Sequence, residues 1–210
     1  MIETTYNRIA GQSLERLAAL SDGLFAIAMT LLVLDLRVPV VAAVHSEGDL
    51  WQALAALAPR LVAYLMSFLT LGIFWVGQQT QLNLFARGNR NLTWIHIAFL
   101  LFVSMMPFST ALLASFITFR IALAVYWLNI LVLGLTLLWS WTYATAAGLV
   151  KDDVAAAARA AVRRRIVVAQ TLYAVGMALC VVNTYVSLAV IVLVQLLYVV
   201  GPRSRLLDRL

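Results

Sequence analysis

The chain has 210 residues, of which 64% are hydrophobic and only 11% are charged. A soluble domain typically contains roughly 45–50% apolar and about 25% charged residues. A globule of this length would therefore lack the polar surface that solubility requires, and the mean hydropathy of +0.96 agrees. These values exclude an ordinary soluble domain and indicate a multi-pass membrane protein.

Charge and cysteine content exclude further classes. The net charge is +6, with 14 Arg and one Lys, but these residues lie between apolar runs rather than along one face, which argues against a nucleic-acid partner. The single cysteine, Cys180, permits no intrachain disulfide, and no Cys/His cluster indicates zinc.

Apolar runs long enough to cross a bilayer, about 17–25 residues, predict six transmembrane helices in a single domain that covers residues 1–210. The predicted helices are about 20–38, 61–77, 92–113, 121–143, 166–182 and 186–200. The last two come from one apolar run that is too long for a single span and divides near Asn183 as a tight hairpin. The predicted fold class is therefore an all-α membrane protein.

Two shorter helices are expected at the membrane surface. Asp49 can cap an amphipathic helix that continues through Ala58, with Trp51 at the level of the lipid headgroups and Pro59 at its end. The alanine-rich stretch 152–164 has helical spacing and is expected to lie along the cytoplasmic face.

The distribution of basic residues predicts the orientation of the six helices. If there are six spans, 12 of the 15 basic residues fall on one side of the membrane. These are Arg8, Arg16, Arg87, Arg90, Lys151, Arg159, Arg163, Arg164, Arg165, Arg203, Arg205 and Arg209. By the positive-inside rule this side is cytoplasmic, and both termini are expected there. The expected location is the plasma membrane of a prokaryote.

The residues that enzymes use form no recognisable constellation. The two histidines, His45 and His96, lie in no metalloprotease motif, and the sequence contains neither a nucleophile elbow nor a glycine-rich phosphate loop. We therefore do not expect an enzyme, a cofactor or a resident metal ion.

The first predicted helix is unusual because it carries charged residues. A charge within a membrane span is costly and needs a partner, a cavity or a function. Asp22 lies near the cytoplasmic end, and Asp35 with Arg37 lies near the outer end. Two plainer interpretations remain open: Ser21 and Asp22 form a helix N-cap, and Asp35 and Arg37 sit at the outer interface.

Helical spacing places Ile27, Thr30, Leu31 and Leu34 on one stripe of this helix. Such a stripe usually packs against another helix. In an oligomer assembled around the first helix, however, it would form stacked rings. Apolar rings can gate an ion path by dewetting, and a ring of Thr30 hydroxyls can replace part of the hydration water of an ion.

Several segments resemble the transmembrane protein 175 family, in its prokaryotic branch. The first helix begins Arg16-Leu-Ala-Ala-Leu20-Ser21-Asp22 and ends Leu-Asp-Leu-Arg-Val-Pro39, similar to the family signature of Arg, three residues and Phe-Ser-Asp. Further similar stretches are Ala63-Tyr-Leu-Met-Ser-Phe68, Phe74-Trp75 and Leu100-Leu-Phe-Val-Ser-Met-Met-Pro107-Phe-Ser-Thr-Ala-Leu112. The resemblance covers most of the chain.

The resemblance implies a potassium-selective leak-type channel, formed by a homotetramer in the lipid bilayer with the first helix of each subunit lining a central pore. Counted from the signature aspartate, the family's apolar constriction falls on Ile27, Leu31 and Leu34. Its pore-facing threonine, implicated in selectivity, falls on Thr30. The resemblance also implies that Arg16, Ser21 and Asp22 support and orient the pore helix.

The chain departs from the family pattern at two places. The signature Phe is Leu20, which removes aromatic contacts at the cytoplasmic end of the pore helix. Many relatives carry a His-His or Asn-His pair after Phe-Trp, whereas this chain has Gly77-Gln78-Gln79. The resemblance therefore leaves open whether this position braces the pore helix here, although glutamine can still form hydrogen bonds.

The sequence thus predicts a channel for K⁺ and other monovalent cations that prefers K⁺ to Na⁺ modestly. The selectivity is expected to be modest because apolar and hydroxyl rings lack the dense cage of dipoles of a carbonyl filter. Two rival hypotheses remain: a proton-coupled secondary transporter that uses Asp22 or Asp35, and a membrane assembly subunit that does not conduct ions. The transporter would need polar residues at the midplane, where the first helix offers only Thr30.

Overall fold

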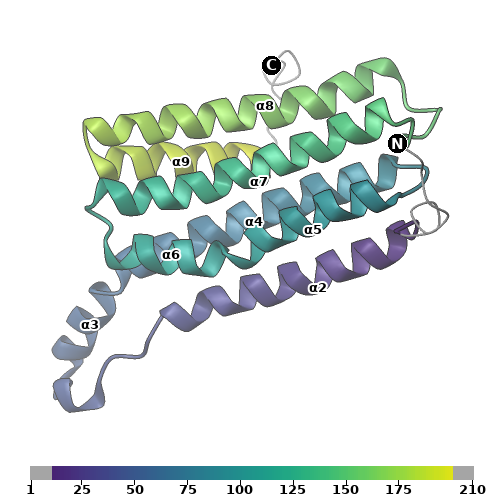
Figure 1. The fold of residues 1–210 in the computed structure, drawn as a ribbon. Coiled ribbons are helices and arrows are strands. Elements are labelled where there is room, and N and C mark those ends of the chain that lie inside the picture. Colours follow the sequence, from purple (N-terminus) through teal and green to yellow (C-terminus); the bar gives the residue numbers. More distant parts are fainter. Residues whose placement is uncertain (1–10, 201–210) are drawn as a thin grey trace.

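A computed structural model describes residues 11–200, and this part of the chain is a bundle of helices (Figure 1). The α-helices are α2 (Leu14–Leu32), α3 (Glu47–Ala55), α4 (Ala58–Leu84), α5 (Arg90–Ser104), α6 (Met106–Ser115), α7 (Arg120–Ala146), α8 (Ala156–Ala178) and α9 (Thr184–Val200). Short 3₁₀ turns are η1 (Val33–Asp35), η2 (Val41–Ala43) and η3 (Leu179–Val181). In the described residues the only other pairing is an isolated antiparallel bridge between Phe85 and Val150.

The bundle has two distinct ends. The start of α2, the α4–α5 connection and the α7–α8 connection lie at one end, whereas α3, the α6–α7 turn and the α8–α9 turn lie at the other (Figure 1). Arg87 and Lys151 in these two connections, and Arg90 and Arg159 in the first turns of the helices that follow them, therefore share one end. The remaining basic residues of the termini, Arg8, Arg203, Arg205 and Arg209, lie outside the described residues.

Five helical segments are long and apolar enough to cross a membrane, judged by length and composition. They are Leu14–Asp35, Ala58–Leu84, Arg90–Ser115, Arg120–Ala146 and Ala156–Val181. The sixth predicted helix corresponds to α9, an apolar helix of 17 residues. The multi-pass character is confirmed, and the described residues give five long spans plus this shorter helix.

Several helix ends differ from the sequence prediction. The first α-helix begins at Leu14 and ends at Leu32, where the backbone tightens into η1, instead of covering 20–38. The alanine-rich stretch 152–164 is expected to lie along the cytoplasmic face. From Ala156 onwards it is instead the first part of α8 and so continues into the fifth span. Alanine and arginine are good helix formers, so the helix has no reason to start at the membrane boundary.

The third predicted helix, 92–113, is interrupted. α5 ends at Ser104 and α6 begins at Met106, with Pro107 in the first turn of α6. Proline has no N–H, and its ring clashes with the carbonyl one turn earlier, so a helix commonly breaks just before it. The two pieces still form one candidate span of 26 residues.

The surface helix predicted after Asp49 is also corrected. It is α3, which is capped by the Ser46 side chain and ends at Ala55 rather than Ala58. Pro59 does not end it but lies in the first turn of α4, a position where its missing N–H is not needed. Asp49 lies in the first turn of α3, where its negative charge interacts favourably with the positive end of the helix dipole.

The apolar core lies between α2, α4, α5, α6, α7, α8 and α9. α7 is central and packs on α4, α5, α6 and α8, whereas α2 lies at one edge against α4, α5 and α6. α8 and α9 lie at the opposite edge (Figure 1). Only one face of α2 is therefore covered by the rest of the described chain.

Candidate functional site

The exposed face of α2 carries the residues that the sequence singled out. The side chains of Ile27 and Leu31 are 56% and 44% exposed, and Leu34 in η1 is 69% exposed. Thr30 is exposed as well. On the opposite face the buried residues are Leu17, Ser21, Phe25, Ala28 and Leu32. The predicted stripe is thus brought together on one side of the helix, and that side does not pack against the core of the described chain.

Leu34 stays on the stripe although it lies beyond the α-helix. An α-helix turns about 100° per residue, so Leu34 would lie about 20° from Ile27 after seven residues. The last two steps belong to η1, and a 3₁₀ helix turns about 120° per residue. These two steps together add about 40° of rotation, so Leu34 lies about 20° from Ile27 in the opposite rotational sense and stays on the same face.

Thr30 presents a hydroxyl on this apolar face. Its Oγ1 donates a hydrogen bond to the Ile27 carbonyl oxygen at 2.9 Å. Donation to the backbone uses the only hydrogen of the hydroxyl and leaves its oxygen lone pairs as acceptors. A cation beside α2 would therefore meet an oxygen ligand at Thr30 and apolar groups one turn to either side.

Ser21 and Asp22 attach α2 to one turn of α4. The Ser21 hydroxyl accepts a hydrogen bond from Gln78 Nε2 at 2.6 Å and donates to the Leu17 carbonyl at 2.8 Å. Asp22 Oδ1 accepts from Trp75 Nε1 at 2.8 Å and from Gln79 Nε2 at 2.6 Å. We call Ser21, Asp22, Trp75, Gln78 and Gln79 the α2–α4 clamp.

The clamp excludes the N-cap interpretation of Ser21 and Asp22. The N-cap is Ser13, whose Oγ accepts from the Arg16 N–H at 3.2 Å, and Ser21 lies two turns inside the helix. Arg16 itself is exposed in the first turn of α2. Near the other end of α2, the Arg60 guanidinium donates to the backbone carbonyl of Asp35 at 3.2 Å.

Sequence reasoning did not assign a site role to Trp75, Gln78 and Gln79. Their spacing of i, i+3 and i+4 places them on one face of a helix, and three polar donors on one face of an apolar span are a signal of a partner. Gln78 is fully buried, so its amide needs a hydrogen bond. The glutamines that replace the family's histidine pair thus do brace the first helix.

A buried polar cluster holds α4 within the bundle. Thr110 Oγ1 donates to Ser67 Oγ at 2.7 Å, and Gln195 Nε2 donates to Thr70 Oγ1 at 2.7 Å. The Tyr126 hydroxyl lies 3.3 Å from both Ser67 and Thr70. Hydrogen bonds between helices stabilise membrane bundles, so α6, α7 and α9 fix the position of the helix that carries half of the clamp.

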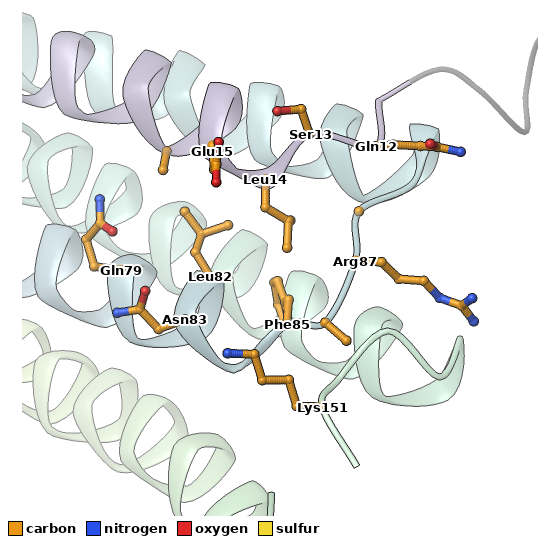
Figure 2. A pocket seen from close by; sticks show the side chains of 13 residues that line it. Gln12, Ser13, Leu14, Glu15, Gln79, Leu82, Asn83, Phe85, Arg87 and Lys151 are labelled. Carbon is orange, nitrogen blue, oxygen red and sulfur yellow. The ribbon is translucent and has the colours of Figure 1, made fainter. Parts of the chain in front are cut away.

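A recess of about 730 Å³ lies beside the start of α2 (Figure 2). Leu14, Leu82 and Phe85 form its apolar part, and its charged lining residues are Glu15, Arg87 and Lys151. Among the described residues no group of three or more His, Cys, Asp or Glu side chains could hold a metal ion. The site is therefore an exposed apolar helix face with one hydroxyl, anchored by a polar clamp.

This fold and this site define a class: a multi-pass helical membrane protein whose first helix leaves an apolar face unpacked. The sequence pattern of the family described as "Endosomal/lysosomal potassium channel TMEM175" matches residues 16–107. The chain is also 36% identical to a protein named a potassium channel from Streptomyces collinus, over 87% of this chain and 90% of that one. The chain belongs to the TMEM175 family, which confirms the resemblance.

Solved and vertebrate relatives agree with this assignment. The crystal structure of a lysosomal potassium-selective channel TMEM175 homolog from Chamaesiphon minutus matches with a TM-score of 0.79 and 28% identity, covering 91% of this chain and 98% of that chain. The human relative, named an endosomal/lysosomal proton channel, is 36% identical over 100 residues, which are 45% of this chain and 20% of that protein.

Proposed function

We propose that this protein is a potassium-selective, leak-type channel of a prokaryotic plasma membrane, in which the exposed face of α2 lines the ion path. The observation that carries the proposal is the division of α2 into a packed face and an exposed apolar face. Ile27, Leu31 and Leu34 form the constriction, and Thr30 supplies the hydroxyl oxygen. The bacterial relatives named potassium channels support the choice of ion.

One subunit cannot enclose such a path, because the stripe lies on its outer surface. We propose a homotetramer of six-span subunits, with α9 as the sixth span and both termini in the cytoplasm. Four copies of α2 then place their apolar stripes around a shared axis. The grouping of Arg87, Arg90, Lys151 and Arg159 at one end supports a cytoplasmic position for that end.

The selectivity follows from the cost of removing water from the ion. Apolar side chains at Ile27 offer no ligand, so an ion must shed part of its hydration shell to pass. K⁺ holds its water less strongly than the smaller Na⁺. The Thr30 oxygens replace part of the lost water but form only one ring, so the preference for K⁺ is modest.

Flux of K⁺ and Na⁺ from proteoliposomes tests this function, with the oligomer mass measured on the same sample. We expect K⁺ to leave faster than Na⁺. We expect Ile27→Asn to increase cation flux, because an amide in the constriction lowers the barrier to hydration, and Thr30→Ala to lower the K⁺/Na⁺ ratio. Ile121→Asn is the matched control, since Ile121 is exposed on α7, and its flux should equal that of the unmodified protein.

The rival functions give different results in the same assay. A proton-coupled transporter would show saturable movement driven by a pH gradient and stopped by Asp22→Asn. An assembly subunit would show no flux above empty liposomes. If Ile27→Asn and Ile121→Asn change the flux equally, α2 does not line the path.

A further inference from the structure

A groove with a volume of about 120 Å³ opens between α4 and α8, on the side of the bundle away from α2. Leu137 of α7 and Tyr198 of α9 also line it. Within the described residues α9 has 17 residues, whereas α8 has 23 and α4 has 27. Both α4 and α8 therefore extend past the described part of α9 (Figure 1).

Buried polar atoms without a hydrogen-bond partner point to a ligand in this groove. Gln81 is fully buried; its Nε2 donates to the Leu137 carbonyl at 3.0 Å, but its Oε1 has no partner in the described part of the chain. The same holds for Gln170 Oε1 and for the hydroxyl of Tyr173, whose side chain is 2% exposed. All three residues line the groove. A buried polar atom left unpaired is costly, and within a bilayer no bulk water satisfies it.

The position of Gln170 is built into the packing of α7 against α8. The Gln170 side chain occupies the space that a Cβ atom would take at Gly134. Glycine at this position lets the amide lie against the α7 backbone beside the groove. The unpartnered oxygen is therefore held in place rather than free to turn towards another donor.

The rim of the groove carries positive charge. The Arg165 guanidinium carbon lies 5.3 Å from the centre of the Tyr198 ring, and the Tyr198 hydroxyl donates to the Arg165 carbonyl at 3.2 Å. Stacking on an aromatic face leaves the N–H edge of a guanidinium available to an anion. Among the described residues that line the groove there is no carboxylate.

We propose that this groove binds an anionic glycerophospholipid with a hydroxyl-bearing headgroup, of the phosphatidylglycerol type. The phosphate pairs with Arg165, and the headgroup hydroxyls donate to Gln81 Oε1 and Gln170 Oε1. The apolar walls, which include Ile73 and Val76, contact the adjoining acyl chain. Basic pockets between transmembrane helices commonly hold anionic headgroups. Water alone would satisfy the amide oxygens but would leave the cation and the apolar walls without a ligand.

Charge complementarity favours this ligand over the C-terminal residues that follow α9. Residues 201–210 contain three arginines and one aspartate, so their net charge has the same sign as Arg165. The proposal concerns lipid binding, and it does not depend on ion conduction.

The test is lipid retention by the purified full-length protein, measured by native mass spectrometry and by thermal unfolding in detergent. The added probes are phosphatidylglycerol, phosphatidic acid, phosphatidylcholine and inorganic phosphate. We expect phosphatidylglycerol to bind most tightly and to raise the unfolding midpoint. Phosphatidic acid, which has no headgroup hydroxyl, should bind more weakly, and phosphatidylcholine and inorganic phosphate should have little effect.

Matched variants locate the site. Arg165→Gln should weaken phosphatidylglycerol binding about tenfold, the loss of one charged hydrogen-bonded contact. Arg163→Gln removes the same charge from the same helix outside the groove and should bind as the unmodified protein does. Thr80→Trp, at the groove margin, should exclude the lipid by filling the space. A monodisperse elution profile shows that each variant is folded.

Other outcomes overturn the proposal. If Arg163→Gln and Arg165→Gln weaken binding equally, the lipid is attracted by surface charge and not by the groove. If Thr80→Trp retains the lipid, the groove holds water only. If phosphatidic acid binds as tightly as phosphatidylglycerol, the headgroup hydroxyls do not contact Gln81 and Gln170.

Discussion

The helices α2 and α7 are both long and apolar, yet the bundle holds them in opposite ways. α7 is the central helix, and 44% of its most apolar window is buried, whereas the figure for the span that contains α2 is 28%. Leu133 and Ile130 of α7 are fully buried, and Ile27 and Leu31 of α2 lie largely in the open. Packing covers more of α7 than of α2, and it leaves one face of α2 uncovered.

The difference shows how a helix can keep an apolar face outside the core. A helix that packs on one side has few contacts that oppose rotation about its axis. In α2 that resistance comes from the clamp, where the charge of Asp22 and the hydroxyl of Ser21 meet three donors on a single turn of α4. The polar contacts at one end therefore act together with the buried side chains of Phe25, Ala28 and Leu32 to set which face of α2 points outwards.

The largest effect should come from removing apolar volume from α7. Leu133→Ala leaves a cavity in a fully packed region and should lower the free energy of unfolding by about 2–4 kcal/mol. Leu31→Ala removes the same atoms from the exposed face of α2 and should change it by less than about 0.5 kcal/mol. Denaturant unfolding in detergent measures both variants. Equal destabilisation would mean that the stripe on α2 packs as tightly as the core.

A smaller effect should follow from removing the charged member of the clamp. Asp22→Ala loses two short hydrogen bonds to a carboxylate, and bonds to charged groups contribute about 1.5–3 kcal/mol each when shielded. Because Asp22 is exposed, we expect the free energy of unfolding to fall by only about 1.5 kcal/mol in total. We also expect faster hydrogen exchange of the backbone amides along α2. The control is Asp153→Ala, which removes an exposed carboxylate from the α7–α8 connection and should leave both quantities unchanged.

The buried half of the clamp can be measured by a double-mutant cycle. Ser21→Ala and Gln78→Leu each break the 2.6 Å hydrogen bond between the two side chains, so their effects on unfolding should not add. We expect a coupling energy of about 1 kcal/mol. Ser21→Ala combined with Thr142→Val is the control, because Thr142 bonds only to carbonyls of its own helix. Additive effects of Ser21→Ala and Gln78→Leu would show that the hydrogen bond does not hold the helices together.

The stripe on α2 was predictable because helical periodicity alone determines which residues share a face. The family resemblance was predictable as well, since its signature lies in consecutive residues from Arg16 to Asp22. Which way the stripe points was not predictable from α2 itself. The donors that set its direction lie 53–57 positions later in the chain, and only the folded arrangement of α2 and α4 brings them together.

The wrong predictions have a common physical origin. A cap at Asp49 is expected from the sequence, and a cap at Ser21 and Asp22 is one of the interpretations that it leaves open, because these residues stand where an apolar run begins. Ser13 and Ser46 hold those positions instead. Hydrophobicity marks where the bilayer begins, whereas capping marks where the helix begins. Good helix formers extend both α2 and α8 beyond the apolar run. A helix predicted from hydropathy alone is therefore too short at its polar end.

The smallest effect concerns the connection between α2 and α4, which no packed core restrains. Asp49 Oδ2 accepts a hydrogen bond from the His45 N–H at 3.0 Å. This backbone bond, followed by the contact with Ser46, holds the pKa of Asp49 below its ordinary value, against a small opposing effect of desolvation. Because the folded pKa is the lower one, this hydrogen bond contributes its full stability above about pH 4, the unfolded pKa. The contribution is lost as the pH falls through the folded pKa.

We therefore expect the His45 amide to become less protected against hydrogen exchange when the pH is lowered below about 4. Asp49→Ala should abolish this pH dependence, whereas Glu47→Gln, which removes a neighbouring carboxylate, should preserve it. If the protection does not change with pH, the carboxylate of Asp49 does not hold the loop.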